Sequence, residues 1–207
     1  LSTYRLQMRA DCCTFDDAVN LLDYLDDLGV SHVYLSPILT AAAGSTHGYD
    51  VTDPTTVSAG LGGPDGLRRL SDAAHSRGMG LIVDIVPNHV GVDDPRQNRW
   101  WWDVLTNGRQ SEYADYFDID WDVADGRIVL PVLGSDDDVA ALTVDGDVLR
   151  LGDLVLPIAP GTGTGSGADV HARQHYLLTG WRNGVCGYRR FFSITSLAAL
   201  RQEDRRV

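Results

Sequence analysis

Apolar and polar positions in the first ninety residues alternate between strand-like and helix-like patterns, which is typical of parallel α/β folds. Thr14 stands three residues before Asp17, as in a capping box, and apolar residues then follow at spacings of three and four as far as Leu28. This spacing predicts an amphipathic helix. A second helix is predicted from Pro64 to Arg77, since proline suits a first helical turn.

Three strands are predicted around these helices: Tyr4 to Gln7, Val30 to Leu35 and Leu81 to Val86. The third is a near-continuous apolar run with one carboxylate, Asp84, inside it, which is the pattern of a strand buried on both faces. A loop rich in Gly, Ala and Thr is expected after the second strand. Together these segments predict the alternating units of a parallel sheet.

From Gly91 onward the alternation stops, and short strands among aromatic and acidic residues predict a separate β-rich subdomain. Arg127 to Leu133 reads as a strand, and two further strands flank the turn-favouring Asp145-Gly146. The remaining expectations are a solvated loop at 136–138, a flexible surface loop at 159–167 and a helix that begins at Ser196.

Composition narrows the function classes. The 207 residues carry 29 acidic and 17 basic side chains, and the resulting net charge of −12 argues against nucleic-acid binding and favours a neutral or cationic partner. No apolar run is long enough for a membrane span, so no membrane association is expected. The three cysteines are odd in number and include the neighbours Cys12 and Cys13, which favours a reducing compartment and a cytoplasmic location.

Candidate chemistry gathers in two segments that follow predicted strands, His47-Gly-Tyr-Asp50 and Asp84-Ile-Val-Pro-Asn-His89. In parallel α/β folds, ligands bind at the carboxyl ends of the strands. Because a buried carboxylate must be hydrogen-bonded or paired, Asp84 is expected to hold Asn88, His89 or a neighbouring loop in place. The alternative for each segment alone is structural, a satisfied core aspartate and a capping histidine.

These segments resemble the first conserved regions of the α-amylase superfamily, and the resemblance continues along the chain to the maltooligosyltrehalose synthase family within it. The further matching segments are Thr3 to Gln7, Val30 to Ile38, Gly44 to His47, Trp100 to Leu105, Phe117 to Asp120, Leu130 to Gly134 and Tyr188 to Phe192. The family isomerises the reducing-end α-1,4 bond of a maltooligosaccharide to an α,α-1,1 bond. The fold implied is α/β, the N-terminal part of a (β/α)8 TIM barrel with a β-rich inserted subdomain.

The resemblance also implies domain limits. Residues 1–90 would form the first three strand–helix units, 91–187 the inserted subdomain, and 188–207 a return segment toward the barrel. A complete barrel takes about 250 residues. The chain is therefore expected to be an N-terminal piece of a larger enzyme, with the remainder of the barrel elsewhere in the complete protein.

The family mechanism is retaining, with an Asp nucleophile, a Glu acid/base and a supporting Asp. By resemblance none of these three lies within this chain, so no catalytic residue is assigned and the chain alone is expected to be inactive. Tyr49 would form the aromatic platform beneath a sugar ring and His89 would hydrogen-bond its hydroxymethyl group. Asp50 and Asp84 would orient them, and His47 and Asn88 would complete the substrate-binding set.

No cofactor is expected. In calcium-dependent relatives the residue that matches Asn88 helps to hold a metal, but no carboxylate cage surrounds it here, so no metal site is predicted.

Two further segments depart from the family pattern: Leu177 stands where Arg is usual, and Ser193 stands where Asp is usual.

Other interpretations stay open or weak. One or more of Trp100, Trp101 and Trp102 would line a sugar groove, although three consecutive indoles cannot all face one way. Arg189 and Arg190 either pair with aspartates at a strand end, which is the favoured interpretation, or contact sugar hydroxyls. His171 and His175 lack the Glu of a zinc helix, so they are expected to be solvated. The glycines at 163–165 lack the strand–helix context of a dinucleotide site. A non-catalytic maltooligosaccharide-binding remnant, or another hydrolase or transglycosylase of the superfamily, remains the alternative.

Overall fold

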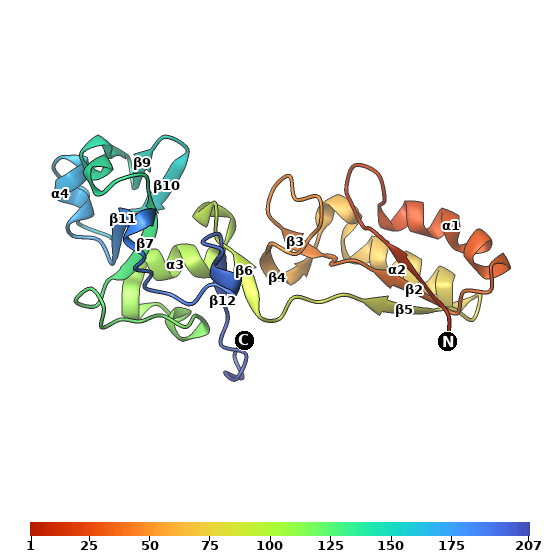
Figure 1. Ribbon diagram of the computed structural model, residues 1–207. Coiled ribbons are helices and arrows are strands. Elements are labelled where there is room, and N and C mark those ends of the chain that lie inside the picture. Colours follow the sequence, from red (N-terminus) through yellow and green to blue (C-terminus); the bar gives the residue numbers. More distant parts are fainter. The chain divides into compact units, whose positions relative to one another are not determined.

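The computed structural model describes residues 1–207, which divide into two compact units, Leu1–Val86 and Pro87–Val207 (Figure 1). In the first unit three parallel strands pair in the order β1-β2-β5, and two helices connect them. The elements are β1 (Thr3–Leu6), α1 (Phe15–Asp27), β2 (His32–Leu35), β3 (Leu39–Ala41), β4 (Val51–Val57), α2 (Gly63–His75) and β5 (Gly80–Val83). The predicted order of strands and helices is confirmed.

Helix α1 forms where its capping residues and apolar spacing predict it. Thr14 Oγ1 accepts a hydrogen bond from Asp17 N, and the Asp17 carboxylate accepts one from Thr14 N at 2.8 Å, which completes the capping box. Phe15 and Leu22 are fully buried in a core shared with α2 and the sheet. Burying side chains of this size contributes about 1.5–3 kcal/mol each.

Two expectations in this unit are wrong. The loop expected after β2 contains the antiparallel hairpin β3–β4, because Val51 and its neighbours bury apolar surface that the composition of residues 39–50 does not reveal. Strand β5 ends at Val83. Asp84 therefore lies just past the strand, where its N–H still donates to Leu35 O at 3.0 Å, and not inside the strand.

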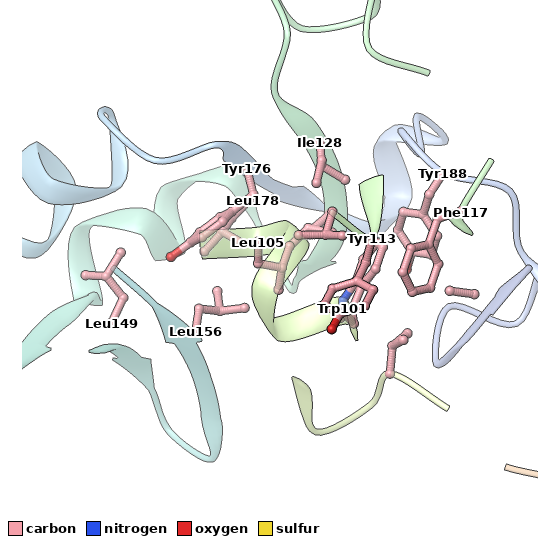
Figure 2. Close-up of a cluster of buried hydrophobic side chains, with 14 of the residues drawn as sticks. Trp101, Leu105, Tyr113, Phe117, Ile128, Leu149, Leu156, Tyr176, Leu178 and Tyr188 are labelled. Carbon is pink, nitrogen blue, oxygen red and sulfur yellow. The ribbon is translucent and has the colours of Figure 1, made fainter. Parts of the chain in front are cut away.

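The second unit is built around short strands and one longer helix. Its elements are β6 (His89–Gly91), α3 (Arg99–Asn107), β7 (Ile128–Leu133), β8 (Thr143–Asp145), β9 (Val148–Leu151), β10 (Leu154–Pro157), α4 (Gly167–His171), β11 (Tyr176–Gly180) and β12 (Leu197–Ala199). Figure 2 shows the core, in which aromatic side chains from α3 and the loops meet leucines from the strands. Trp101 lies at its centre, with ring centroids 4.9 Å from Phe117 and 5.0 Å from Tyr188.

Pairing in this unit confirms the β-rich prediction. The strands around Asp145-Gly146 form the hairpin β8–β9, which β10 extends to three antiparallel strands. The strand predicted at 127–133 is β7, and it pairs in parallel with β11. Helix α3 was not predicted, because it has only nine residues and its three consecutive tryptophans conceal the helical spacing of Trp101, Val104 and Leu105.

The structure overturns the expectation for the C-terminal segment. A strand, β12, replaces the helix expected from Ser196, and it pairs antiparallel with β6. Ala198 is fully buried by this pairing, so tertiary contact outweighs the local helix preference of the alanines. The pairing places residues 197–199 firmly within the second unit.

Residues 136–138 begin a 3-10 helix, and residues 159–167 are hydrogen-bonded to the residues that follow α4. Asp136 accepts hydrogen bonds from Gly180 N at 2.7 Å and from Asn183 Nδ2 at 2.9 Å, which lowers the pKa of its carboxyl, so the segment is not merely solvated. The glycine-rich segment is held by the buried Gln174, whose Oε1 accepts from Ala159 N at 2.7 Å. Arg173 donates to the Thr162 carbonyl at 3.0 Å.

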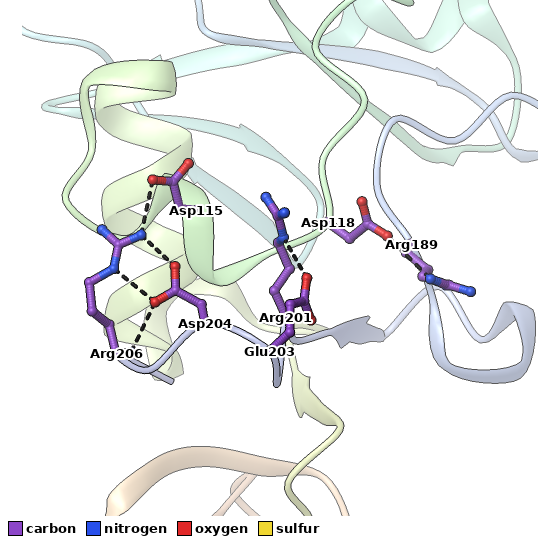
Figure 3. Close-up of polar contacts among 7 residues, drawn as sticks. All are labelled: Asp115, Asp118, Arg189, Arg201, Glu203, Asp204 and Arg206. Atoms are coloured by element: carbon purple, nitrogen blue, oxygen red, sulfur yellow. Dashed lines mark hydrogen bonds and ion pairs between the residues drawn. The ribbon is translucent and has the colours of Figure 1, made fainter.

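Ion pairs connect residues near the C-terminus with the segment before β7 (Figure 3). Arg206 lies between Asp204 and Asp115, at 2.5 and 3.0 Å, and its hydrogen bonds lower the pKa of the Asp204 carboxyl to about 2. Arg189 pairs with Asp118 at 3.4 Å, which confirms the predicted ion pair for this residue, whereas Arg190 donates to Thr195 Oγ1 at 3.0 Å and forms no ion pair. All these side chains are at least partly exposed, so each pair contributes little stability on its own.

No helix combines the length and the apolar character that crossing a membrane requires.

Candidate functional site

Residues 42–50 connect β3 to β4 and carry the first predicted segment. Gly48 adopts φ +77°, and a Cβ at this position would lie 2.8 Å from the Pro37 carbonyl oxygen. Only glycine therefore fits without strain, because both the backbone angle and the close approach exclude a side chain. This glycine sets the direction in which the chain presents Tyr49.

Polar contacts within the connection fix its shape. Ser45 Oγ donates to Asp50 Oδ1 at 2.5 Å and accepts from Gly48 N at 3.0 Å. Tyr49 N donates to His47 Nδ1 at 3.0 Å, and that nitrogen lies 3.8 Å from Asp50 Oδ1. Asp50 and His47 thus act on the backbone of the connection, which fits orienting positions.

Tyr49 is tied to Asp84 at the carboxyl end of β5. The Tyr49 hydroxyl donates to Asp84 Oδ2 at 2.6 Å and accepts from Arg5 Nη2 at 3.3 Å. A hydroxyl between a carboxylate and a guanidinium has a fixed position, since both hydrogen bonds are to charged groups. The side chain of Tyr49 is nevertheless 38% exposed, so its ring is held in place and still accessible to a ligand.

Two members of this cluster were not picked out from the sequence, Arg5 and Tyr34. They pair in register on β1 and β2, so their side chains point to the same face of the sheet. The Arg5 guanidinium lies 5.8 Å from the centre of the Tyr34 ring. Burial and a hydrogen bond to Asp84 raise the pKa of the Tyr34 hydroxyl. The sequence did contain one signal, the charged Arg5 immediately before the buried Leu6 at the end of β1. Its meaning becomes clear only when the register between β1 and β2 is known.

Gln7 extends the same cluster toward the hairpin. Its Oε1 accepts from Arg5 Nη1 at 2.9 Å, and its Nε2 donates to the Thr46 carbonyl at 3.4 Å. The end of β1 is thereby linked to the connection that carries Tyr49. The expectation that Asp84 holds a neighbouring loop is confirmed, because its hydrogen bond fixes Tyr49.

The other two predicted residues, Asn88 and His89, lie in the second unit. His89 is only 4% exposed, its Nδ1 is 2.9 Å from Asn88 Oδ1, and its ring stacks on Phe191 with a centroid distance of 4.2 Å. Asn88 lines a pocket of about 260 Å³ together with Arg189, Arg190, Phe191, Phe192, Ala199, Leu200 and Gln202. His89 is thus a rigidly held imidazole beside a polar and aromatic pocket.

His171 differs from its expectation. It is 4% exposed, and its Nε2 accepts a hydrogen bond from Leu178 N at 3.0 Å, so it is a buried structural residue and not a solvated one. Burial lowers its pKa. No group of three or more His, Cys, Asp or Glu side chains is arranged to hold a metal ion.

The arrangement in the first unit suits a neutral polyhydroxylated ligand. A pyranose ring offers C–H groups to an aromatic face and hydroxyls to polar side chains, and the fixed ring of Tyr49 beside the Asp84 carboxylate offers both. The Tyr49 hydroxyl lies between the Asp84 carboxylate and the Arg5 guanidinium, an arrangement that holds the ring in one position. Binding and orientation are therefore the chemistry that these residues support.

Comparison with known proteins decides the family. Residues 14–137, more than half of the chain, match the family model described as the catalytic domain of alpha amylase. The chain belongs to the α-amylase family. This part of the chain includes the β3–β4 hairpin, Asp84 and the three tryptophans of α3.

Individual relatives are more specific. A Mycobacterium tuberculosis (strain H37Rv) protein provisionally named maltooligosyl trehalose synthase is 74% identical over all of this chain, which spans 28% of that relative. The solved maltooligosyltrehalose synthase from Arthrobacter ramosus superimposes with a TM-score of 0.95 at 56% identity, covering 99% of this chain and 27% of that one. An intracellular maltogenic amylase of Bacillus subtilis is 44% identical over 101 residues, 49% of this chain and 16% of its own length.

These findings confirm the fold predicted from the sequence. The three parallel strands and two helices of the first unit are an N-terminal part of the (β/α)8 barrel, and the second unit supplies the β-rich subdomain. The chain spans little more than a quarter of the synthases that it matches.

Proposed function

We propose that the protein containing this chain is an intramolecular transglucosylase. It converts the reducing-end α-1,4 bond of a maltooligosaccharide into an α,α-1,1 bond, which gives a trehalose-ended product. The observation that carries the proposal is the 74% identity over the whole chain to a protein provisionally named maltooligosyl trehalose synthase. The fixed and accessible ring of Tyr49 at the carboxyl edge of the sheet supports it physically.

This chain contributes substrate binding. Tyr49 stacks beneath the glucosyl ring at the reaction centre, and His89 donates a hydrogen bond to its hydroxymethyl group. Asp84 and Asp50 orient the tyrosine and its backbone, while His47 and Asn88 hold the same two segments. Arg5 acts as a positioning residue through its hydrogen bond to the Tyr49 hydroxyl, and Tyr34 supports Arg5 through the contact between its ring and the guanidinium.

The chemical step belongs to carboxylates elsewhere in the complete protein. A retaining mechanism needs a nucleophile and an acid/base carboxyl about 5–5.5 Å apart on either side of the scissile bond. The carboxylates of the first-unit cluster are occupied with orientation: Asp84 accepts from the Tyr49 hydroxyl and Asp50 accepts from Ser45. The chain alone is therefore expected to turn over no maltohexaose.

The test is product analysis of the complete protein with maltohexaose. Chromatography and NMR distinguish the α,α-1,1 linkage of a trehalose-ended hexasaccharide from glucose, maltose and shorter maltooligosaccharides. A trehalose-ended product of unchanged length supports the proposal. Hydrolysis products alone would assign the protein to the amylase activity that its likeness to the maltogenic amylase also allows.

A parallel assay uses the 207-residue chain without the rest of the protein. Turnover that increases with the amount of purified chain would contradict the assignment of the catalytic carboxylates to other parts of the protein. If both the chain and the complete protein bind maltohexaose without turnover, the alternative of a non-catalytic maltooligosaccharide-binding remnant would be favoured. The cytoplasmic location and the absence of nucleic-acid and membrane partners stay predictions.

A further inference from the structure

The three consecutive tryptophans of α3 have three different environments. Trp100 packs on Tyr113 and Tyr116, with centroid distances of 6.2 and 5.1 Å, and Trp101 is 2% exposed in the core. Trp102 is half-buried and lines a groove on the surface of the second unit. Successive residues of a helix point about 100° apart. Burial of Trp101 therefore leaves Trp102 on a different face.

The groove has a volume of about 360 Å³, and its lining comes from α3, the segment before it and the β9–β10 pair. Val148 and Arg150 are two residues apart on β9, so they lie on one face, and Val155 of β10 stands opposite Arg150. The volume falls in the range of about 300–1,000 Å³ that is typical of small-ligand sites. Trp102 and the two valines form an apolar floor.

The start of α3 is fixed, which holds Trp102 in place. Asn98 is fully buried; its Nδ2 donates to Gly91 O at 3.0 Å, and its Oδ1 accepts from Trp101 N at 3.0 Å. This N-cap secures the first turn of the helix. The indole of Trp102 thus projects from a rigid turn and not from a mobile loop.

Three guanidinium groups complete the lining, and each already has a partner. Arg96 pairs with Asp94 at 2.8 Å, Arg150 pairs with Asp145 at 2.6 Å, and Arg99 donates to the Tyr113 hydroxyl at 2.7 Å. Two of the three positive charges are therefore balanced by carboxylates. A phosphate ligand would have to compete with these carboxylates, whereas sugar hydroxyls can both donate to the carboxylates and accept from the guanidinium groups.

We propose that this groove is a second maltooligosaccharide-binding site. A glucosyl unit stacks its C–H face on Trp102, and its hydroxyls bond to the Arg96–Asp94 and Arg150–Asp145 pairs. None of the lining residues belongs to the Tyr49 cluster or to the pocket beside Asn88. The choice of an α-1,4 glucan over other neutral sugars rests on the proposed function. The site holds substrate without reacting with it.

The experiment measures binding of β-cyclodextrin to the complete protein by titration calorimetry. This cyclic α-1,4 glucan has no reducing end, so a reducing-end isomerase cannot convert it. The titrations use the Tyr49→Ala background, which removes the aromatic platform of the other site. Trp102→Ala and, separately, Arg150→Ala are each expected to weaken binding about tenfold or more, equivalent to about 1.4 kcal/mol.

Trp181→Ala is the matched control, because Trp181 is a tryptophan of the same unit that is 59% exposed and lies outside the groove. It should leave the affinity unchanged. Because Arg150 lies at the surface, its variant gives a result even where Trp102→Ala fails to fold.

Equal affinity for β-cyclodextrin in the parent and in the folded groove variants would overturn the proposal. Binding of inorganic phosphate that is lost in Arg150→Ala, with no binding of β-cyclodextrin, would overturn it in favour of an anion site. Absence of a trehalose-ended product, with groove binding retained, would overturn the proposed function but leave a neutral-glucan site in place.

Discussion

Tyr49→Phe separates the two contributions of Tyr49, because it keeps the ring and removes only the hydroxyl. The change breaks the 2.6 Å hydrogen bond to Asp84 and the 3.3 Å hydrogen bond from Arg5. Hydrogen bonds to charged groups contribute about 1.5–3 kcal/mol. The Tyr49 side chain is partly exposed, so the lower end of that range applies.

A loss of about 1.5 kcal/mol corresponds to roughly a tenfold decrease in kcat/KM. Tyr49→Ala also removes the ring and is expected to cost several kcal/mol, that is, at least about a hundredfold. The assay is the initial rate of maltohexaose conversion by the complete protein, with Tyr24→Phe as the control. Tyr24 is 61% exposed on α1, so its variant should match the parent enzyme.

Either of two outcomes would refute this reasoning. If Tyr49→Phe is as active as the parent, the hydroxyl contacts do not position the ring. If Tyr49→Phe is as impaired as Tyr49→Ala, the ring itself contributes nothing and the platform assignment fails. Arg5→Gln should reproduce part of the Tyr49→Phe effect, since it removes the second partner of the same hydroxyl.

Three further changes test other parts of the structure. Gly48→Ala should lower kcat/KM by at least about tenfold, because a left-handed residue other than glycine costs about 1–2 kcal/mol and the new Cβ meets the Pro37 carbonyl. The measurement is steady-state kinetics, with Gly44→Ala as the control: its Cβ would meet nothing within 4 Å, so the comparison separates the clash from the backbone strain. Gln174→Ala should cost about 1–3 kcal/mol, since it leaves the buried Ala159 amide without its acceptor, and faster cleavage by a protease at 159–167 would report it. The pKa of buried His171 is lowered, so the unfolded chain binds the proton more readily; stability should fall as pH drops below the unfolded pKa of about 6.5 and level off below the folded pKa. Hydrogen exchange at Leu178, the amide bonded to His171, should show this pH dependence, and His171→Gln should flatten it while the exposed His75→Gln does not.

The sequence predicts local features of the fold well and features that depend on tertiary contact poorly. The capping box at Thr14 and the turn at Asp145-Gly146 are read directly, because the residues that stabilise them are neighbours in the chain. The strand at Leu197 is missed, because its partner β6 lies more than a hundred positions earlier. His171 is judged solvated for the same reason, since the Leu178 amide that it bonds belongs to another element.

The candidate site shows the same difference between local features and features that depend on tertiary contact. Tyr49 and Asp84 follow from their segments, but the 2.6 Å bond between them depends on the β3–β4 hairpin, which the composition of that region concealed. Arg5 and Tyr34 become visible only when β1 and β2 are aligned residue by residue. The residue types of a site are thus readable from sequence, whereas the partners that fix its geometry come from the register of the sheet.

Helix α3 has nine residues, a length at which an isolated helix does not persist in water. Its first turn is held by the Asn98 cap and by Trp101, which is anchored in the core, so the surface position of Trp102 depends on a buried neighbour. A replacement of Trp101 that changes its packing in the core would also shift the turn that carries Trp102. Among homologues, we therefore expect exchanges at these two adjacent positions to occur together.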